Sequence, residues 1–390
     1  MSIADGPEWA GAVRPINLFF RKQNGFLLAE RRGVTRVRVC HSNGAAYDAP
    51  PSPCDRHAMT TDIDLTTFED IQAAARRIAP YAVRTPLLES PALSDRLSAR
   101  VFLKPETLQR TGSFKFRGAC NRLGLIPEED RTKGVVAFSS GNHAQGVAAA
   151  AALFGMPATI VMPADAPKAK MEGTRRYGAT VVTYDRQRED REAIASRICA
   201  EQGATLVKPF DDRYVIAGQG TVGLEIAQDL QRRGVVADHV IVPCGGGGLV
   251  SGVSLAIANA SPATGTIGVE ASGYEGMKLS LASGKRTATP ASAKTLADSL
   301  MAPQPGQIPF ALAREYISSV DVVNDEDLQR AVSLAFRTLK LVVEPGGSAA
   351  LAAILARKIE VYGKTLVVVL SGSNVDLDVF TQCCAAVAEP

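Results

Sequence analysis

From Thr66 onward, short apolar runs alternate with longer stretches in which apolar residues recur at helical spacing. Residues 67–78, for example, place Phe68, Ile71, Ala74 and Ile78 on one side of a helix. The alternation of such stretches with runs rich in Val, Ile and Thr predicts βαβ units and a parallel sheet that is covered on both faces. The predicted strands are 135–139, 158–162, 180–183, 205–207, 239–243, 266–270, 320–323 and 365–370, and the other predicted helices are 188–202, 220–233, 326–339 and 348–358.

Composition removes several classes of protein. Hydrophobic residues make up 46% and charged residues 21% of the 390, which is typical of a packed globular protein. No apolar run reaches the ~20 residues of a membrane-spanning helix, so no membrane partner is expected. The seven cysteines are odd in number and lack CxxC spacing. This usage disfavours a disulfide scaffold and a structural zinc site, and it favours a reducing compartment such as the cytoplasm.

Residues 1–58 differ from the rest of the chain. They contain the only tryptophan, Trp9, together with an Arg-rich patch and a Pro-rich stretch. They also carry the entire net charge of +3, which leaves the remainder neutral and disfavours nucleic acid as a partner. Because acidic residues are present as well, an organelle transit peptide is a weaker interpretation. A disordered extension or an upstream start codon, with Met59 opening the folded part, explains the segment better.

One lysine stands in unusual surroundings, in the segment Thr-Gly-Ser-Phe-Lys-Phe-Arg-Gly at 111–118. Lys115 lies between two aromatic residues at the start of an expected helix. Such surroundings would exclude water and lower the pKa of the amine, as a lysine that forms a Schiff base requires. Without further context, a lysine exposed on a helix surface is the more frequent outcome.

Two loops that follow predicted strands offer donors to an anion. Ser-Ser-Gly-Asn-His-Ala-Gln-Gly at 139–146 would open a helix whose backbone N–H groups suit a carboxylate or phosphate. Helix capping by Ser140 or Asn142 explains this loop equally well. Cys-Gly-Gly-Gly-Gly-Leu at 244–249 lets the backbone wrap a phosphate. It matches neither the GxGxxG register nor the Walker pattern, which disfavours a nicotinamide dehydrogenase.

In this order, and together with Ser-Gly-Ser-Asn at 371–374, these segments resemble those of the fold-type-II pyridoxal-phosphate enzymes, within the threonine dehydratase and serine racemase branch. The resemblance runs from about Leu65 to Asp376 and includes Ile-Ala-Gly-Gln-Gly-Thr at 216–221 and Glu-Pro-Gly-Gly at 344–347. It implies a two-domain α/β fold of parallel-rich twisted sheets flanked by helices, with pyridoxal 5′-phosphate between the domains. Residues 59–130 and 211–390 would form the large domain, and residues 131–210 a small domain that closes over the substrate.

The resemblance also implies how the cofactor is held. Lys115 would bind it covalently, with Phe114 beside the ring. Asn142 would donate a hydrogen bond to the phenolic oxygen, and Ser371 would face the pyridine nitrogen. The backbone of five successive residues would cradle the phosphate: Gly245, Gly246, Gly247, Gly248 and Leu249.

The implied substrate is a small 3-hydroxy amino acid, whose carboxylate Ser139, Gly141 and His143 would bind. The implied activity is that of an ammonia-lyase that forms a 2-oxo acid and ammonia, with L-threonine and L-serine as first candidates and 3-hydroxyaspartate next. Ser140 stands where threonine dehydratases commonly have alanine, and a hydroxyl on the second face of Cα is what racemisation requires. A racemase with dehydratase side activity, and a regulatory protein that binds the cofactor without turnover, stay open as alternatives.

Two departures from the family pattern affect what the chain is expected to bind. Serine racemase-like proteins hold a divalent cation through a segment that matches 270–276. Glu270 is present here, but Gly276 replaces the aspartate, so no metal site is expected. Ser299 and Ser373 stand where the family has glycine, and both changes would affect which β-substituent the cavity prefers. The branch is usually dimeric, so a homo-oligomer is expected.

Overall fold

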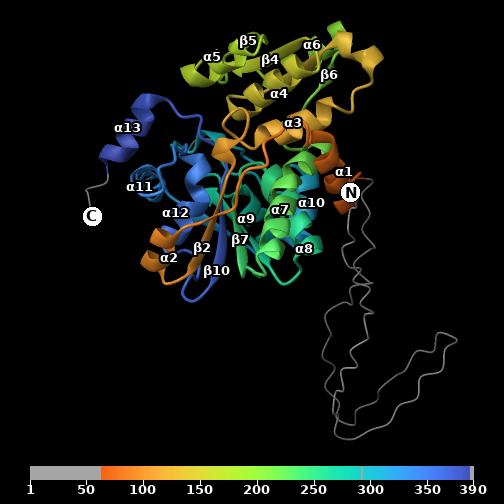
Figure 1. Cartoon of the computed structure of the whole chain (residues 1–390). Coiled ribbons are helices and arrows are strands. Elements are labelled where there is room, and N and C mark those ends of the chain that lie inside the picture. The colour runs from red at the N-terminus through yellow and green to blue at the C-terminus, as the bar shows by residue number, and fades with distance from the viewer. Residues whose placement is uncertain (1–62, 291–292, 387–390) are drawn as a thin grey trace, which may run out of the picture. The chain divides into compact units, whose positions relative to one another are not determined.

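The computed structural model describes residues 63–290 and 293–386, which form two β-sheets with helices around them (Figure 1). The larger sheet has the strand order β1-β2-β10-β7-β8-β9. Its strands pair in parallel except for β1, which runs antiparallel to β2. The strands are β1 (Leu88–Glu89), β2 (Arg100–Pro105), β7 (His239–Pro243), β8 (Gly265–Ala271), β9 (Ser319–Val323) and β10 (Thr365–Leu370).

The smaller sheet has the order β5-β4-β3-β6 and is parallel throughout. All eight predicted strands are present, with ends shifted by at most one residue, while β1 and β2 were missed. In β2 the apolar pattern is interrupted by Lys104, which is fully buried because its Nζ lies 2.6 Å from Oε2 of Glu225. The strands of the smaller sheet are β3 (Val135–Phe138), β4 (Ala158–Pro163), β5 (Thr180–Tyr184) and β6 (Thr205–Leu206).

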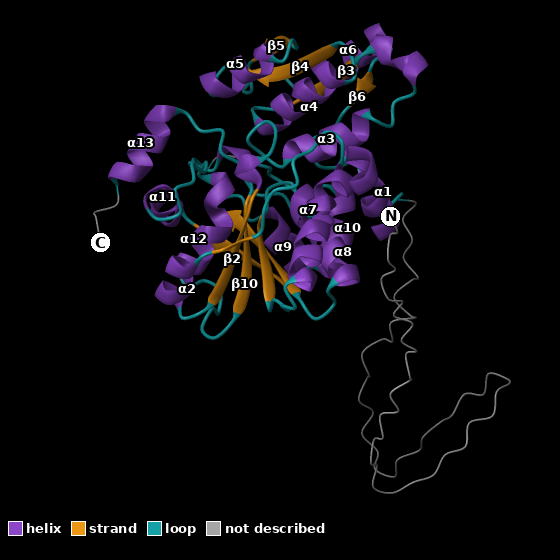
Figure 2. Cartoon of the chain, viewed as in Figure 1, coloured by secondary structure: helices purple, strands orange, loops and turns teal. Residues whose placement is uncertain are grey.

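Helices cover both faces of the larger sheet (Figure 2). Helices α2, α11 and α12 pack on one face, and α7, α8 and α10 on the other. The α-helices are α1 (Phe68–Ile78), α2 (Pro91–Leu97), α3 (Lys115–Leu123), α4 (Asn142–Leu153), α5 (Lys168–Arg176), α6 (Arg191–Gln202), α7 (Arg213–Arg232), α8 (Gly248–Ala260), α9 (Gly276–Ser283), α10 (Gln307–Tyr316), α11 (Asp325–Arg337), α12 (Ala349–Leu355) and α13 (Leu377–Ala385). Short 3₁₀ turns are η2 (Glu106–Leu108), η3 (Glu128–Lys133), η4 (Asp298–Leu300) and η5 (Gly346–Ser348).

Helix α7 begins at Arg213, seven residues before the predicted start at 220. Its N-cap, Asp212, accepts hydrogen bonds from the N–H groups of the second and third helical residues. The glycines that made this segment look non-helical serve close packing. A Cβ at Gly218 would lie 2.5 Å from the Cα of Gly118 on α3. The cost of glycine in a helix is therefore offset by the approach of two backbones.

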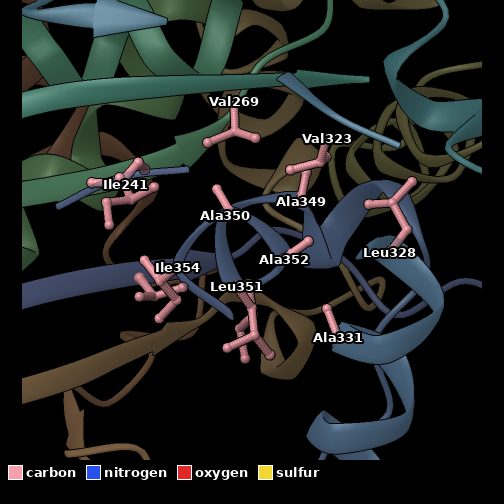
Figure 3. Packing of buried hydrophobic residues seen from close by; sticks show 14 of the residues in the cluster. Ile241, Val269, Val323, Leu328, Ala331, Ala349, Ala350, Leu351, Ala352 and Ile354 are labelled. Carbon is pink, nitrogen blue, oxygen red and sulfur yellow. The ribbon is translucent and has the colours of Figure 1, made fainter. Parts of the chain in front are cut away.

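Alanine-rich α12 packs closely on the larger sheet, as Figure 3 shows. Small side chains allow this approach, which fixes the segment just before α12 at the ends of the strands. That segment contains Glu344 and η5. The labelled residues of the cluster come from α12 (Ala349, Ala350, Leu351, Ala352, Ile354), from three strands (Ile241, Val269, Val323) and from α11 (Leu328, Ala331).

The predicted small domain, 131–210, contains all four strands of the smaller sheet. Helix α3 lies outside that range, yet Phe116 and Leu123 belong to the same hydrophobic cluster as Val147 of α4 and Met162 of β4. The division at 130/131 therefore stays a prediction. The predicted extension, 1–58, lies outside the described residues. Within the described part, five cysteines are free thiols and no helix is long and apolar enough to cross a membrane.

Candidate active site

One cavity collects every residue to which the sequence assigned a site role. It lies at the carboxyl ends of β3, β7 and β10, where ligands bind in open α/β sheets. Segments far apart in the sequence thus meet at one place. The predicted residues that line the cavity are Phe114, Lys115, Ser139, Ser140, Gly141, Asn142, His143, Gly245, Gly246, Gly247, Gly248, Leu249 and Ser371.

Lys115 is the first residue of α3, and its amine faces the cavity. Nζ donates a hydrogen bond of 2.7 Å to the backbone carbonyl of Pro209. Desolvation by the surrounding protein lowers the pKa of the amine to about 8, although the charge of Glu344 acts in the opposite direction. The alternative of a solvated surface lysine is therefore wrong. Lys115 has the lowered basicity that a lysine needs to react with a carbonyl group.

The loop 139–143 leads from β3 into α4, whose N-cap is Gly141. No side chain caps this helix, so capping by Ser140 or Asn142 is excluded. Instead, the hydroxyl of Ser139 accepts a hydrogen bond of 3.1 Å from the N–H of Gly141. The first N–H groups of α4 consequently have no side-chain partner, and residues 141–143 line the cavity, which makes this helix end suitable for an anion.

His143 is only 2% exposed, and its Nε2 lies 3.0 Å from the carbonyl oxygen of Val207. A carbonyl accepts only from a protonated nitrogen, so Nε2 carries the hydrogen and Nδ1 is the acceptor. Nδ1 is buried without a partner. Burial and the charge of Lys115 lower the pKa of the ring to about 3. His143 is therefore neutral at physiological pH and adds no charge to the cavity.

The glycine loop joins β7 to α8 and is closely packed. A Cβ at Gly246 would lie 2.4 Å from the ring of Phe210. Gly247 has a φ of +93°, which residues other than glycine rarely adopt. The backbone N–H groups of Gly245, Gly246 and Gly247 have no hydrogen-bond partner among the described residues. Together with the N-terminus of α8, they form a cradle of backbone donors.

Asn142 and Ser371 also line the cavity. Asn142 Nδ2 donates a 2.5 Å hydrogen bond to Oε1 of Glu344, and its Oδ1 accepts one of 2.8 Å from Asn374 Nδ2. These two bonds fix which end of the amide is the donor. Ser371 follows β10 directly, and its carbonyl accepts a hydrogen bond from the N–H of Phe114, which ties it to the start of α3.

Four charged residues of the cavity were not assigned a role from the sequence: Lys170, Arg191, Asp298 and Glu344. Asp298 and Glu344 occur in segments that carry the family resemblance, but their motifs gave no reason to expect ionic contacts. Lys170 and Arg191 lie in polar helices that resemble solvated surface. Only the three-dimensional packing brings these side chains to the cavity.

Comparison with known proteins identifies this arrangement. A family model described as pyridoxal-phosphate dependent enzyme matches residues 78–372. The chain belongs to this family. The threonine ammonia-lyase of Thermotoga maritima is 43% identical over 318 residues, which cover 82% of this chain and 78% of that protein. The L-threo-3-hydroxyaspartate ammonia-lyase of Saccharomyces cerevisiae is 42% identical over 313 residues, covering 80% and 94%. The structure of maize serine racemase is 37% identical, with a TM-score of 0.77 and coverage of 82% and 96%.

The family resemblance drawn from the loops, its two-sheet α/β fold and its cofactor are thus confirmed. The residues of the cavity also fit pyridoxal phosphate chemically. Unpartnered N–H groups at the glycine loop suit a phosphate dianion, and a side chain on Gly246 would disrupt that cradle. Lys115 supplies the amine for the aldehyde. The second hydrogen of Asn142 Nδ2 is available to the phenolic oxygen, because Glu344 uses only one.

Glu270, the one retained member of the family's cation segment, makes contacts within the protein. Its Oε1 accepts from the N–H of Met277 at 2.7 Å, and its Oε2 from that of Lys278 at 2.9 Å, at the start of α9. In the described part of the chain, no group of three or more His, Cys, Asp or Glu residues is arranged to hold a metal ion. The expected absence of a metal site stays a prediction.

Proposed function

We propose that the chain is an ammonia-lyase that converts a small 3-hydroxy amino acid to a 2-oxo acid and ammonia. The β-hydroxyl first leaves as water, and hydrolysis of the resulting enamine takes up one water and releases ammonia, so the net loss is ammonia alone. The observation that carries the proposal is the amine of Lys115, which faces the cavity with its pKa lowered to about 8. Such an amine is a competent base near neutral pH. Three relatives of more than 40% identity bear ammonia-lyase names, which supports the same reaction class.

The substrate's carboxylate is held by the N-terminus of α4. The unpartnered N–H groups there, and the hydroxyl of Ser139 beside them, favour a negative charge. Neutral His143 supports the loop through its hydrogen bond to Val207 and does not compete as a base, because its pKa is lowered to about 3. These contacts orient the Cα–H bond of the substrate toward Lys115.

Proton transfer is the task of Lys115. When bound, the cofactor supplies an electron sink for the negative charge that develops on Cα. Once the substrate's amine has taken its place, Lys115 Nζ is free to remove the Cα proton. The resulting ammonium can return that proton to the β-hydroxyl, which leaves as water. Ser371 is neutral and stabilises no proton on the ring nitrogen, which favours prompt departure of the hydroxyl over competing reactions.

The position of Arg191 favours a substrate that carries a second carboxylate. It is the first residue of α6 and lines the cavity, with its guanidinium 5.3 Å from the ring of Phe138. No carboxylate of the described residues pairs with it. A guanidinium in this position favours 3-hydroxyaspartate over threonine and serine, since a planar cation binds a carboxylate by two hydrogen bonds.

The test is to measure 2-oxo acid release from L-threonine, L-serine and L-threo-3-hydroxyaspartate. If 3-hydroxyaspartate, which yields oxaloacetate, has the highest kcat/KM of the three, both the reaction and the substrate preference are supported. In Arg191→Gln the kcat/KM for 3-hydroxyaspartate should fall about 10–100-fold, the value of one charge-assisted contact, while that for threonine changes little. Release of no 2-oxo acid from any of the three would reject the ammonia-lyase reaction. Equal losses with all substrates would reject the role of Arg191.

The structure bears differently on the two alternative functions, a racemase and a regulatory protein without turnover. Ser140 lies within the loop 139–143 and lines the cavity, which supports racemisation as a side reaction. A regulatory protein without turnover would need no base of lowered pKa, so the lowered pKa of Lys115 argues against it.

We also propose that the protein is a homo-oligomer in the cytoplasm. The five free thiols of the described part support a reducing compartment. Analytical ultracentrifugation would measure the oligomeric state.

A further inference from the structure

Lys170 is a buried cation on a helix that otherwise presents its basic residues to solvent. It belongs to α5, where Lys168, Arg175 and Arg176 are exposed, whereas Lys170 is 2% exposed. A lysine is almost never fully buried unless its charge is compensated. Its Nζ lies 2.6 Å from Oδ2 of Asp298 and 3.1 Å from Oε2 of Glu344. Two carboxylates therefore share one ammonium at the edge of the cavity.

These two carboxylates depend on Lys170 to different degrees. The side chain of Asp298 is 32% exposed, so water can solvate it if the ammonium is lost. The side chain of Glu344 is 1% exposed. Burial raises the pKa of Glu344, and the ammonium of Lys170 acts against that rise. Without Lys170, the carboxyl of Glu344 would take up a proton and become a donor.

The ionic state of Glu344 decides the orientation of Asn142. Glu344 Oε1 accepts from Nδ2 of Asn142, and Oδ1 of the same amide accepts from Asn374. An ionised carboxylate can only accept, so it holds Nδ2 on its own side. A protonated Glu344 could instead donate to Oδ1, and the amide would no longer be held in one orientation. The stem of Lys170 also packs against the loop 139–143, because a Cβ on Gly141 would lie 2.4 Å from its Cδ.

We propose that Lys170 is a positioning residue, which keeps Glu344 an acceptor and so fixes the Asn142 amide beside the cofactor. Lys170 comes from a helix beside the smaller sheet, while Asp298 and Glu344 lie in η4 and just before η5. The ammonium thus joins segments on both sides of the cavity. This inference rests on membership of the cofactor family and deepens the proposed function, because it concerns the same site. It does not depend on which substrate is turned over.

The experiment uses the full chain loaded with pyridoxal phosphate and compares Lys170→Met with Lys168→Met. The control removes the same charge from an exposed position on the same helix. In Lys170→Met we expect the visible absorption and fluorescence of the bound cofactor to change, while borohydride still fixes it to Lys115. Turnover should show a lower kcat, by about 10²-fold as for a misplaced reacting group, with a smaller change in KM. Lys168→Met should match the unaltered protein.

Two further variants separate positioning from a merely structural role. Lys170→Arg keeps the charge and should restore the spectrum at least in part. In the double variant Lys170→Met/Glu344→Gln, a neutral amide acceptor faces Asn142 without need of an ammonium, so the cofactor spectrum should return toward that of the unaltered protein. Coupling of this kind between neighbouring residues is what a double-mutant cycle measures.

Each outcome decides the proposal. A spectrum in Lys170→Met equal to that of Lys168→Met overturns it, as does a double variant that is folded but as altered as the single one. If Lys170→Met does not fold, the double variant decides alone: a native-like spectrum supports the proposal, and failure to fold assigns Lys170 a structural role and overturns it. A protein with normal spectra and no turnover of any hydroxy amino acid would reject the proposed reaction while leaving the Lys170 result valid.

Discussion

The amine of Lys115 is hydrogen-bonded to the backbone carbonyl of Pro209 at 2.7 Å. Lys115 begins α3, whereas Pro209 follows β6, so this bond crosses from one element of the cavity wall to another. A carbonyl can accept from the neutral amine as well as from the ammonium. Pro209 therefore holds Nζ toward the cavity without fixing its protonation state, which the desolvated surroundings set instead.

The first prediction is that borohydride reduction of the cofactor-bound protein labels Lys115. Two other lysines near this segment are engaged elsewhere. Lys104 is fully buried beside Glu225, and Lys133 pairs with Asp130 on the surface. Peptide mapping should place the label on the peptide that contains Lys115, and Lys115→Ala should abolish it. A label on Lys104 or Lys133 would contradict the assignment.

The second prediction concerns the pH at which the cofactor-free protein takes up pyridoxal phosphate. Only the unprotonated amine attacks the aldehyde, and the pKa of Lys115 is lowered to about 8 from 10.5. The rate of covalent uptake should therefore rise with pH and level off just above pH 8. Stopped-flow absorbance between pH 6.5 and 10 would measure it. A rate that still rises tenfold per pH unit above pH 9 would show an ordinary lysine.

The third prediction is a loss of stability in acid that depends on His143. Its folded pKa of about 3 lies below the ordinary value of 6.5, so the unfolded chain binds the proton first as the pH falls. Stability from this group is present above pH 6.5 and is lost between pH 6.5 and 3, by up to about 1.4 kcal/mol per pH unit.

Urea unfolding at pH 4, 5, 6 and 7 would compare the unaltered protein with His143→Gln, which keeps a donor for Val207. The difference in the free energy of unfolding should change across this range, because carboxylates contribute equally to both proteins. Two parallel curves would show that His143 does not titrate as the burial implies.

The sequence located the site because its loops follow apolar strands that pack as expected. Lys115, Asn142, Gly246 and Ser371 lie next to such strands or in motifs of unusual composition, so local pattern was sufficient. Lys170 could not be found in this way. Its burial depends on partners 128 and 174 positions later in the chain, at Asp298 and Glu344.

The same limit explains the missed strand β2. The sequence alone predicts that Lys104 lies on the surface. In the structure it is buried, because Glu225 on α7 supplies the opposite charge. Hydrophobic periodicity records which side chains avoid water, but a buried ion pair is defined by two residues whose separation in sequence carries no signal.

A fourth prediction tests the cradle of the glycine loop. In Gly246→Ala, the new Cβ would lie 2.4 Å from the ring of Phe210, so the loop would have to shift. From the typical cost of overpacking, cofactor binding should weaken about 5–100-fold. Gly268→Ala is the control, since its Cβ would come no closer than 3.3 Å, to a side-chain methyl of Val320. Titration of absorbance with pyridoxal phosphate measures both. Equal dissociation constants would mean that the loop does not bind the cofactor.

The last prediction is that Ser140 divides two activities. If its hydroxyl is the acid or base on the second face of Cα, Ser140→Ala should abolish racemisation of serine and exchange of the α-proton with inversion. Elimination from the L-substrate needs only Lys115 and should survive. Removing one acid–base group typically costs about 10²–10⁴-fold in the step that uses it, which is enough to separate the outcomes.

Ser140 does not cap α4, because Gly141 is the N-cap and no side chain bonds there. The melting temperature should therefore stay near that of the unaltered protein, so that a change in activity reports chemistry and not folding. Equal loss of both activities, or loss of neither, would reject the role on the second face.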